Sequence, residues 1–210
     1  MALDIPSIYP ITDTAISGLS IPEQVRRFIA GGATFIQIRD KQASSREFFE
    51  AAAAAMAIAR EHDVRVVIND RVDIAMMVSA DGVHLGQEDL SPPHARQLLG
   101  ERAIIGYSTH TLQQAKEAAA MPVDYIAFGP VFPTSTKDRP DPVVGLEMLR
   151  QVKELIGDRP LVAIGGITLK TVRSVLTAGA DSAAIISDVL CDADQISERI
   201  SGLISLAHTV

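Results

Sequence analysis

Residues 34–69 read TFIQIRDKQASSREFFEAAAAAMAIAREHDVRVVIN and predict a complete strand–helix–strand unit. Thr34–Arg39 and Arg65–Asn69 are short apolar runs with Val, Ile and Phe, as buried parallel strands are. Between them, Ser44–Glu47 places a capping hydroxyl three residues before a glutamate, which predicts the start of a helix over Ser45–Glu61. A strand, a helix and a second strand in this order are typical of a parallel sheet.

The same alternation of short apolar runs and helical stretches extends along the chain. The predicted strands are Ser7–Thr12, Thr34–Arg39, Arg65–Asn69, Gly82–Leu85, Ala103–Tyr107, Tyr125–Phe128, Leu161–Ile164 and Ala183–Ile186. Each is followed by a predicted helix, and no Pro-, Gly- or Ser-rich linker divides the chain. Eight such units in 210 residues predict an α/β fold, a closed (β/α)8 TIM barrel that forms a single domain over residues 1–210. An open doubly wound sheet is the alternative, but no sign of a reversal in strand order favours it.

Several of the predicted helices have recognisable start and stop signals. Ser20–Glu23 repeats the hydroxyl-to-glutamate spacing and adds a proline in the first turn. Ser91, which two prolines follow, and Thr168 are expected to start two further helices. Gly179 is expected to end the helix over Val172–Ala178. These signals predict where the loops between strands and helices lie.

Composition restricts the classes of function. The net charge of −7 argues against a nucleic-acid or anionic-membrane partner, because phosphate contacts need clustered Lys and Arg. The amino terminus lacks the pattern of a signal peptide, and no window of about 18 uncharged apolar residues could span a membrane. Cys191 is the only cysteine, which excludes an internal disulfide, and we expect it to be a small buried hydrophobic residue. A cytoplasmic protein is predicted.

Polar residues at the carboxyl-terminal ends of the strands are the candidates for function, because the sites of such barrels form there. Side chains alternate along the second strand, so Ile36 and Ile38 are expected to pack outward against helices. Gln37 and Arg39 are then expected to face the barrel interior. Their position predicts that they point towards the barrel mouth.

Lys41 shares this face of the strand with Arg39 and adds a second cation. Two cations and an amide at the barrel mouth would suit an anionic ligand, since arginine offers a forked donor to phosphate. The alternative is an internal salt bridge of Arg39 with Asp40 or with a neighbouring strand. A ligand is the favoured reading, because a buried arginine without a defined partner is costly.

Two carboxylates are expected at the ends of adjacent strands. The third strand ends in Asn69 and Asp70, and the fourth leads into a loop that contains Asp89. Because strands three and four are neighbours in the barrel, Asp70 and Asp89 can approach each other. Two carboxylates beside cations form a ligand set for Mg²⁺, which fills its shell with waters and substrate phosphate oxygens. The alternatives are a helix cap for Asp70 and a solvated loop position for Asp89.

The fifth strand is followed by two further candidates. Ser108 is expected at the lip of the barrel, and His110 lies just before the next helix. A lone histidine there usually hydrogen-bonds a helix end, so a catalytic role for His110 is the less favoured reading. His84 in the fourth strand is expected to be a core histidine with satisfied hydrogen bonds.

The loop after the sixth strand offers several donors to phosphate oxygens. Thr134, Ser135 and Thr136 supply three hydroxyls, and Lys137 supplies a cation. The long connection over residues 138–145 is a candidate lid. This loop predicts an anion site on that side of the barrel mouth.

A second phosphate site is predicted after strands seven and eight. Barrel enzymes often hold a phosphate between these two loops, on backbone N–H groups and the start of a short helix. Gly165 and Gly166 follow the seventh strand and allow close backbone approach, while Ser187 follows the eighth. The residues therefore predict two anion sites in one barrel mouth, as suits an enzyme that joins a pyrophosphate and a monophosphate.

Taken together, these motifs resemble the thiamine phosphate synthase family. The resemblance rests on Gln37–Lys41, Asn69–Arg71, Gly82–Gln87 with Asp89, Gly106–Ser108, Pro130–Lys137 and Ala163–Ile167, in the family's order. It implies that the aminopyrimidine pyrophosphate is held by Gln37, Arg39, Lys41, Asn69, Ser108 and Lys137. It also implies that Mg²⁺ is held by Asp70 and Asp89, and the thiazole phosphate by Thr134, Ser135, Thr136, Gly166, Ile186 and Ser187.

The chemistry that this resemblance implies is loss of pyrophosphate from the pyrimidine methylene, followed by capture of the resulting carbocation by the thiazole nitrogen. Catalytic roles are implied for Arg39, Lys41, Ser108 and Lys137. Mg²⁺ and the cations would neutralise the charge that develops on the leaving group. Ser182 departs from the family pattern, which has a glycine in this stretch, and puts only local backbone geometry in doubt.

Two other functions stay open at this point. A thiazole tautomerase of the same fold resembles the chain around Gly106–His110, and there a histidine would transfer protons. A non-catalytic protein that binds a thiamine precursor is the second alternative. Lys41, Asp70 and Asp89 favour the synthase, because neither alternative needs a metal or a pyrophosphate site. The expected partners are small-molecule substrates, and the sequence leaves a homo-oligomer open.

Overall fold

The computed structural model describes residues 3–134 and 141–209. Ser135, Thr136 and Lys137, to which roles are assigned above, lie outside the described residues, as do residues 138–140 of the candidate lid. Thr134 is described and is half-buried.

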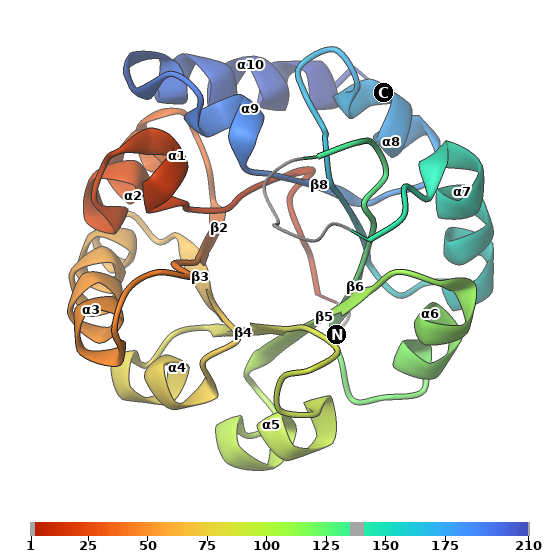
Figure 1. Cartoon of the computed structure of the whole chain (residues 1–210), viewed down its shortest axis with the longest axis horizontal. Helices are drawn as coiled ribbons and strands as arrows, with labels where there is room; N and C mark the ends of the chain where they lie inside the picture. Colours follow the sequence, from red (N-terminus) through yellow and green to blue (C-terminus); the bar gives the residue numbers. More distant parts are fainter. Residues whose placement is uncertain (1–2, 135–140, 210) are drawn as a thin grey trace.

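Eight parallel strands form the wall of a barrel (Figure 1). They are β1 (Ile8–Pro10), β2 (Phe35–Ile38), β3 (Arg65–Asn69), β4 (Gly82–Leu85), β5 (Ile104–Thr109), β6 (Tyr125–Phe128), β7 (Leu161–Ile164) and β8 (Ser182–Ile185). Their order is β1-β8-β7-β6-β5-β4-β3-β2. Beyond the end of β1, a parallel bridge joins Ile11 to Gln37, and the N–H of Thr12 donates to the Gln37 carbonyl at 3.0 Å. The predicted (β/α)8 barrel is confirmed.

Helices surround this sheet on its outer side (Figure 1). They are α1 (Thr14–Ser17), α2 (Ile21–Ala30), α3 (Ser45–Glu61), α4 (Val72–Val78), α5 (Pro92–Leu99), α6 (Leu112–Ala119), α7 (Gly145–Ile156), α8 (Val172–Thr177), α9 (Ser187–Leu190), the short 3₁₀ helix η1 (Ala193–Gln195) and α10 (Ile196–Ala207). The capping box predicted at Ser44 is present, with the Ser44 hydroxyl accepting from the Glu47 N–H and the Glu47 carboxylate accepting from the Ser44 N–H.

Two of the predicted helix starts differ from the structure. Ser20 precedes α2, but its side chain makes no capping hydrogen bond. The carboxylate of Glu23 instead pairs with Arg27 at 2.8 Å, so it is directed along the helix. Thr168 does not start a helix, because its backbone N–H donates to the Thr171 hydroxyl at 2.9 Å and forms a turn. The helix α8 begins only after that turn, at Val172.

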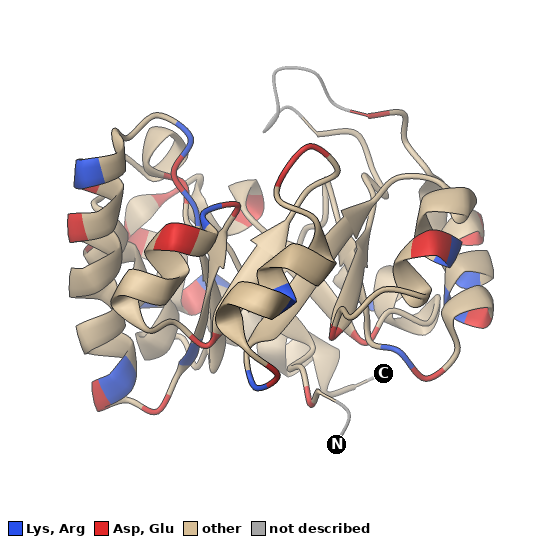
Figure 2. Cartoon of the chain, turned by 90° about the horizontal axis from the view of Figure 1, so that it is seen from below, with Lys and Arg blue, Asp and Glu red and all other residues tan. Residues whose placement is uncertain are grey.

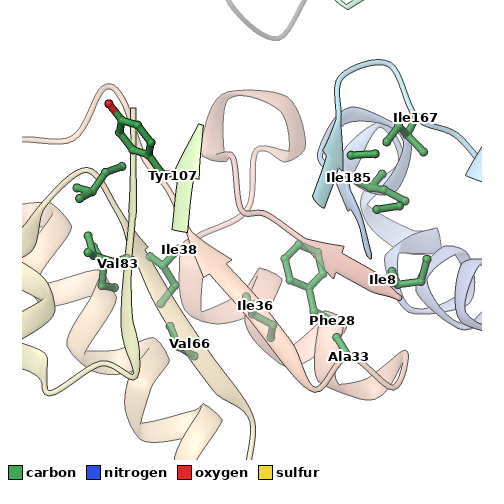
Figure 3. Packing of buried hydrophobic residues seen from close by; sticks show 14 of the residues in the cluster. Ile8, Phe28, Ala33, Ile36, Ile38, Val66, Val83, Tyr107, Ile167 and Ile185 are labelled. Atoms are coloured by element: carbon green, nitrogen blue, oxygen red, sulfur yellow. The ribbon is translucent and has the colours of Figure 1, made fainter. Parts of the chain in front are cut away.

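The buried residues form two layers. Outward-facing strand residues such as Ile36, Ile38 and Val66 pack against the helices (Figure 3). A smaller inner cluster fills the barrel and consists of Ile5, Tyr9, Ile11, Phe35, Val67, Ile104, Tyr125, Ala127, Val162 and Ala184. Because these side chains fill the barrel interior, a ligand can bind only at the ends of the strands.

Cys191 differs from its prediction, since it is exposed. It is the C-cap residue of α9, a single turn that buries Val189 and Leu190 instead. The apolar side of this turn is therefore already occupied by its two preceding residues, which leaves Cys191 on the solvent side.

Both chain ends lie on the side of the barrel opposite the described part of the loop that joins β6 to α7 (Figure 2). Lys, Arg, Asp and Glu are scattered over the outer helices in that view. In residues 3–134 and 141–209, no helix has the length and apolar character needed to cross a membrane. Candidate residues such as Asp70 and Ile186 directly follow the carboxyl-terminal ends of β3 and β8.

Candidate active site

Gln37 and Arg39 have the inward orientation that the strand pattern predicts. Gln37 is only 2% exposed, and its side-chain N–H donates to the Tyr9 hydroxyl inside the barrel at 2.8 Å. Ile36 and Ile38, which alternate with them, are buried in the outer layer. The second strand therefore places the Gln37 amide and the Arg39 guanidinium on the side that faces the barrel mouth.

The guanidinium of Arg39 already has a protein partner. Its Nη1 lies 2.5 Å from Oδ2 of Asp13, which follows β1, and the two side chains are only 13% and 11% exposed. The other Asp13 oxygen caps α1 by accepting from the N–H groups of Ala15 and Ile16. A salt bridge to a neighbouring strand, left open above, is therefore present, and the remaining N–H groups of the guanidinium fork keep a ligand role for Arg39 open.

Lys41, Asp70 and Asp89 meet at the mouth of the barrel. The ammonium of Lys41 forms an ion pair with Oδ2 of Asp70. Asp89 also interacts with Asp70, and Oδ2 of Asp89 accepts the Gly86 N–H at 2.7 Å. Burial, together with the nearby Asp70 carboxylate, raises the pKa of Asp89 above its ordinary value. The predicted approach of the two carboxylates is present in the structure.

This carboxylate pair has the donor chemistry for a hard divalent cation. Among the described residues, no group of three or more His, Cys, Asp or Glu side chains could hold a metal ion. Mg²⁺ does not need such a group, because it commonly binds one or two carboxylates and keeps waters and phosphate oxygens. Burial is the main cause of the raised pKa of Asp89, and the Asp70 carboxylate adds to it; a cation between the two carboxylates would offset both effects. Asp70 and Asp89 therefore fit Mg²⁺.

Ser108 and Asn69 lie on the strands next to these groups. The Ser108 hydroxyl is 2.8 Å from Nε2 of His84, and the Ser108 carbonyl accepts from the Gln87 side chain at 2.6 Å. Asn69 ends β3 opposite His84 in the strand register. His84 is buried with hydrogen bonds at both ring nitrogens, as predicted for a core histidine.

His110 links the end of β5 to the loop after β6. Its Nδ1 lies 2.6 Å from the Gly129 carbonyl, and its Nε2 lies 3.5 Å from Oδ2 of Asp141. Its backbone N–H donates to the side chain of Gln114 in α6. The His110 side chain therefore joins the loop after β5 to the loop after β6, and only its backbone N–H bonds to α6, which differs from the predicted hydrogen bond of the side chain to a helix end.

Gly165 and Gly166 bring the loops after β6 and β7 into close contact. Both have positive φ values, +98° and +63°. A Cβ atom at Gly165 would lie 2.4 Å from the Pro130 Cβ, and one at Gly166 would lie 2.4 Å from the Pro133 carbonyl oxygen. In this structure the glycines thus make space for a neighbouring loop, which brings Thr134 to the same side of the mouth as Gly166.

Ile186 and Ser187 begin the short helix α9 directly after β8. The next residue, Asp188, holds this start in place, because its Oδ2 accepts the N–H of Leu169 in the loop after β7 at 3.1 Å. On the opposite side, Arg199 of α10 donates to the Asp188 carbonyl at 3.1 Å. The loops after β7 and β8 are therefore fixed to each other at the predicted phosphate site.

Several residues at the mouth and in the barrel interior were not singled out from the sequence. Asp13 is the partner of Arg39, and Tyr9 and Tyr125 connect Gln37 to His84 through hydrogen bonds at 2.8, 2.9 and 2.9 Å. The sequence pattern could have indicated the two tyrosines, because they lie on the inward-facing side of their strands, where a buried phenol hydroxyl needs a polar partner.

Comparisons with known proteins show which family the chain resembles. The family model described as "Thiamine monophosphate synthase" matches residues 8–189. The thiamine-phosphate synthase of Koribacter versatilis is 42% identical over 99% of this chain and 98% of its own length. That of Persephonella marina is 45% identical over 94% of this chain and 93% of its own. The solved structure of a thiamine phosphate pyrophosphorylase from Pyrococcus furiosus superposes with a TM-score of 0.87 at 38% identity, covering 97% of this chain and 96% of that one.

Proposed function

The chain belongs to the thiamine monophosphate synthase family, and from this premise we propose how its barrel mouth forms thiamine phosphate. The protein is a transferase that joins a pyrimidine-methyl group to thiazole phosphate. The C–O bond between the pyrimidine methylene and pyrophosphate breaks, and a C–N bond to the thiazole nitrogen forms. We further propose that residues 1–210 act as one catalytic domain in the cytoplasm.

The pyrimidine pyrophosphate is assigned to the side of the mouth formed by β2 to β5. The side-chain amides of Gln37 and Asn69 and the hydroxyl of Ser108 would bind polar atoms of the pyrimidine pyrophosphate. Arg39 and Lys41 would face the pyrophosphate, and Lys137 is included from the sequence resemblance. What supports this assignment is that β2, β3, β4 and β5 are consecutive neighbours in the sheet, so their ends converge on one region.

Asp70 and Asp89 are proposed to hold Mg²⁺ beside this pyrophosphate. The supporting observation is the contact between the two carboxylates next to the Lys41 ammonium. Mg²⁺ bound there would supply positive charge to the oxygens of the leaving pyrophosphate. Lys41 would add charge at the same place, and its present pairing with Asp70 keeps its ammonium at the mouth.

The thiazole phosphate is assigned to the opposite side, between the loops after β6, β7 and β8. Gly166 and the start of α9 at Ile186 and Ser187 would offer backbone N–H groups, and Thr134 a hydroxyl. Ser135 and Thr136 are included from the sequence resemblance. The contact from Asp188 to the Leu169 N–H supports this assignment, because it holds two of these loops together.

The chain's own residues contribute charge stabilisation and positioning in this proposal. Arg39 and Lys41, with Lys137 included from the sequence resemblance, would stabilise negative charge as pyrophosphate departs. Charges that are fixed at the site before the reaction lower the barrier. Holding both substrates in one mouth brings the thiazole nitrogen to the carbocation as it forms. No residue needs to remove a proton from carbon or to form a covalent bond with the substrate.

The alternative tautomerase needs a histidine at the position of His110. Both ring nitrogens of His110 face protein groups, the Gly129 carbonyl and the Asp141 carboxylate, which favours the synthase. The test is an assay with both substrates and Mg²⁺ that measures release of pyrophosphate. Turnover of the thiazole phosphate alone, with no pyrophosphate release, would contradict the proposal, and binding of either substrate without turnover would favour a sensor.

A further inference from the structure

Five polar side chains form a continuous row across the barrel interior. Gln37 Nε2 lies 2.8 Å from the Tyr9 hydroxyl, which lies 2.9 Å from the Tyr125 hydroxyl. That hydroxyl is 2.9 Å from Nδ1 of His84, and Nε2 of His84 is 2.8 Å from the Ser108 hydroxyl. The five residues come from β2, β1, β6, β4 and β5. The row therefore joins two proposed substrate contacts, Gln37 and Ser108, through three buried rings.

The rings in the middle of this row are held rigidly. Tyr9 and Tyr125 are buried, and they pack edge-to-face with each other and with Phe35. The rings of His84 and Tyr125 are stacked with a centroid distance of 5.5 Å. A Cβ at position 106 would lie 2.0 Å from Cζ of Tyr125, so the absence of a side chain at Gly106 makes room for the phenol. The hydroxyl positions are thus determined by packing.

The protons available in this row determine which group donates in each hydrogen bond. Burial raises the pKa of both phenols, so each keeps its single proton. The Gln37 N–H donates to Tyr9, and the Tyr9 proton is then available for the Tyr125 oxygen. The Tyr125 proton in turn is directed to Nδ1 of His84, which must accept and therefore has no hydrogen.

We propose that Tyr9 and Tyr125 are positioning residues that hold His84 as the neutral Nε2–H tautomer. The Nε2–H then donates to the Ser108 hydroxyl oxygen, which leaves the Ser108 proton directed at the barrel mouth. Ser108 consequently acts as a hydrogen-bond donor to an acceptor atom of the pyrimidine substrate. Only this last step rests on the proposed function, since the tautomer is a property of the free protein.

The tautomer can be measured in the full chain labelled with ¹⁵N-histidine, by long-range ¹H–¹⁵N correlation of the imidazole rings. The His84 signals are identified by their loss in His84→Asn. We expect Nε2 to be protonated and Nδ1 to be unprotonated. A protonated Nδ1, in either the other tautomer or the imidazolium, would overturn the proposal.

Two phenylalanine variants test the direction of the row. Tyr125→Phe removes the hydroxyl that donates to Nδ1, so we expect His84 to become a mixture of tautomers. Tyr9→Phe is the matched control, because Tyr125 can still donate to Nδ1, and His84 should stay in the Nε2–H form. If the hydrogen bonds were instead donated from His84 towards Gln37, Tyr9→Phe would change the tautomer of His84. Circular dichroism of both variants establishes that the barrel is folded.

Kinetics test whether Tyr125 acts through Ser108. We expect Tyr125→Phe and Ser108→Ala each to lower kcat/KM by about tenfold, the loss expected for one hydrogen bond. The double variant should lose no more than Ser108→Ala alone, because the two residues act as one unit. Losses that multiply would overturn the positioning role. If pyrophosphate release is absent even in the wild-type chain, the proposed function fails, and the tautomer measurement alone decides this inference.

Discussion

Lys41, in the loop after β2, forms an ion pair with Asp70 at the end of β3. Asp70 adopts a left-handed backbone conformation with φ +63°, and it interacts on its other side with Asp89. One carboxylate thus contacts both a cation and a second carboxylate. In the proposed function, this is the arrangement that receives Mg²⁺ and the leaving pyrophosphate.

The first prediction concerns the carboxylate pair. Asp89→Asn should lower the rate of pyrophosphate release by about 100-fold or more at a given Mg²⁺ concentration, because one of two metal ligands is lost. The control is Asp73→Asn, since Asp73 is a nearby carboxylate on α4 that is 59% exposed and pairs with Arg71. A Mg²⁺ titration of the rate distinguishes the two variants, and an unchanged titration for Asp89→Asn would refute the metal site.

The second prediction concerns the salt bridge between Arg39 and Asp13. Asp13→Asn keeps an N-cap for α1 but removes the partner of a largely buried guanidinium. We expect the free energy of unfolding to fall by about 3 kcal/mol, as when one partner of a buried ion pair is removed. Denaturant unfolding measures this change.

The control for that prediction is an exposed ion pair on α7. Glu147 and Arg150 are 3.2 Å apart, with side chains 76% and 49% exposed. Glu147→Gln should cost less than about 1 kcal/mol, because solvent screens such pairs. Equal losses in Asp13→Asn and Glu147→Gln would mean that the Arg39 salt bridge is not buried in solution.

The strands of this barrel could be predicted from sequence because each is a short apolar run between polar loops. All eight strands are found, and the bounds of Arg65–Asn69, Gly82–Leu85, Tyr125–Phe128 and Leu161–Ile164 agree with the prediction. The alternation within β2 also placed Gln37 correctly. These features depend on the local pattern of apolar residues and on the burial of both faces of each strand. Both can be recognised directly in the sequence.

Partners across the barrel could not be predicted in the same way. Tyr9 and Tyr125 are 116 residues apart. Their hydrogen bond depends on which inward-facing residues lie at the same level along the axis of the closed barrel. The pairing of Arg39 with Asp13 likewise depends on closure between β2 and the segment after β1. Local competition explains the difference at Ser20, where Glu23 pairs with arginines on the same helix instead of the N-cap.

The third prediction uses the two serines that precede α3 and α2. The Ser44 hydroxyl accepts the Glu47 N–H, whereas Ser20 makes no capping hydrogen bond with its side chain. Ser44→Ala should therefore lower the free energy of unfolding by about 1 kcal/mol. Ser20→Ala should lower it by a much smaller amount. Urea unfolding of both variants checks this, and the reverse order would show that the capping box does not stabilise α3.

The fourth prediction separates backbone strain from loop contact at the proposed phosphate site. Gly166 and Gly18 both have left-handed backbones, with φ values of +63° and +69°. A Cβ at Gly166 would lie 2.4 Å from the Pro133 carbonyl oxygen and 2.8 Å from the Phe132 Cβ, whereas a Cβ at Gly18 meets nothing within 4 Å. Gly18→Ala should therefore cost only the left-handed penalty of about 1 kcal/mol.

Gly166→Ala should cost more than Gly18→Ala, because the loop after β6 must also move away from the loop after β7. Since this movement would displace Thr134 and the Gly166 N–H, we expect KM for thiazole phosphate to rise by about tenfold or more, the loss of roughly one hydrogen bond. KM for the pyrimidine pyrophosphate should change little, because its proposed contacts lie on β2 to β5. Steady-state kinetics with each substrate varied in turn measures both constants. An equal rise in both KM values would place the two substrates in contact with the same loops and would contradict the division of the mouth into two sides.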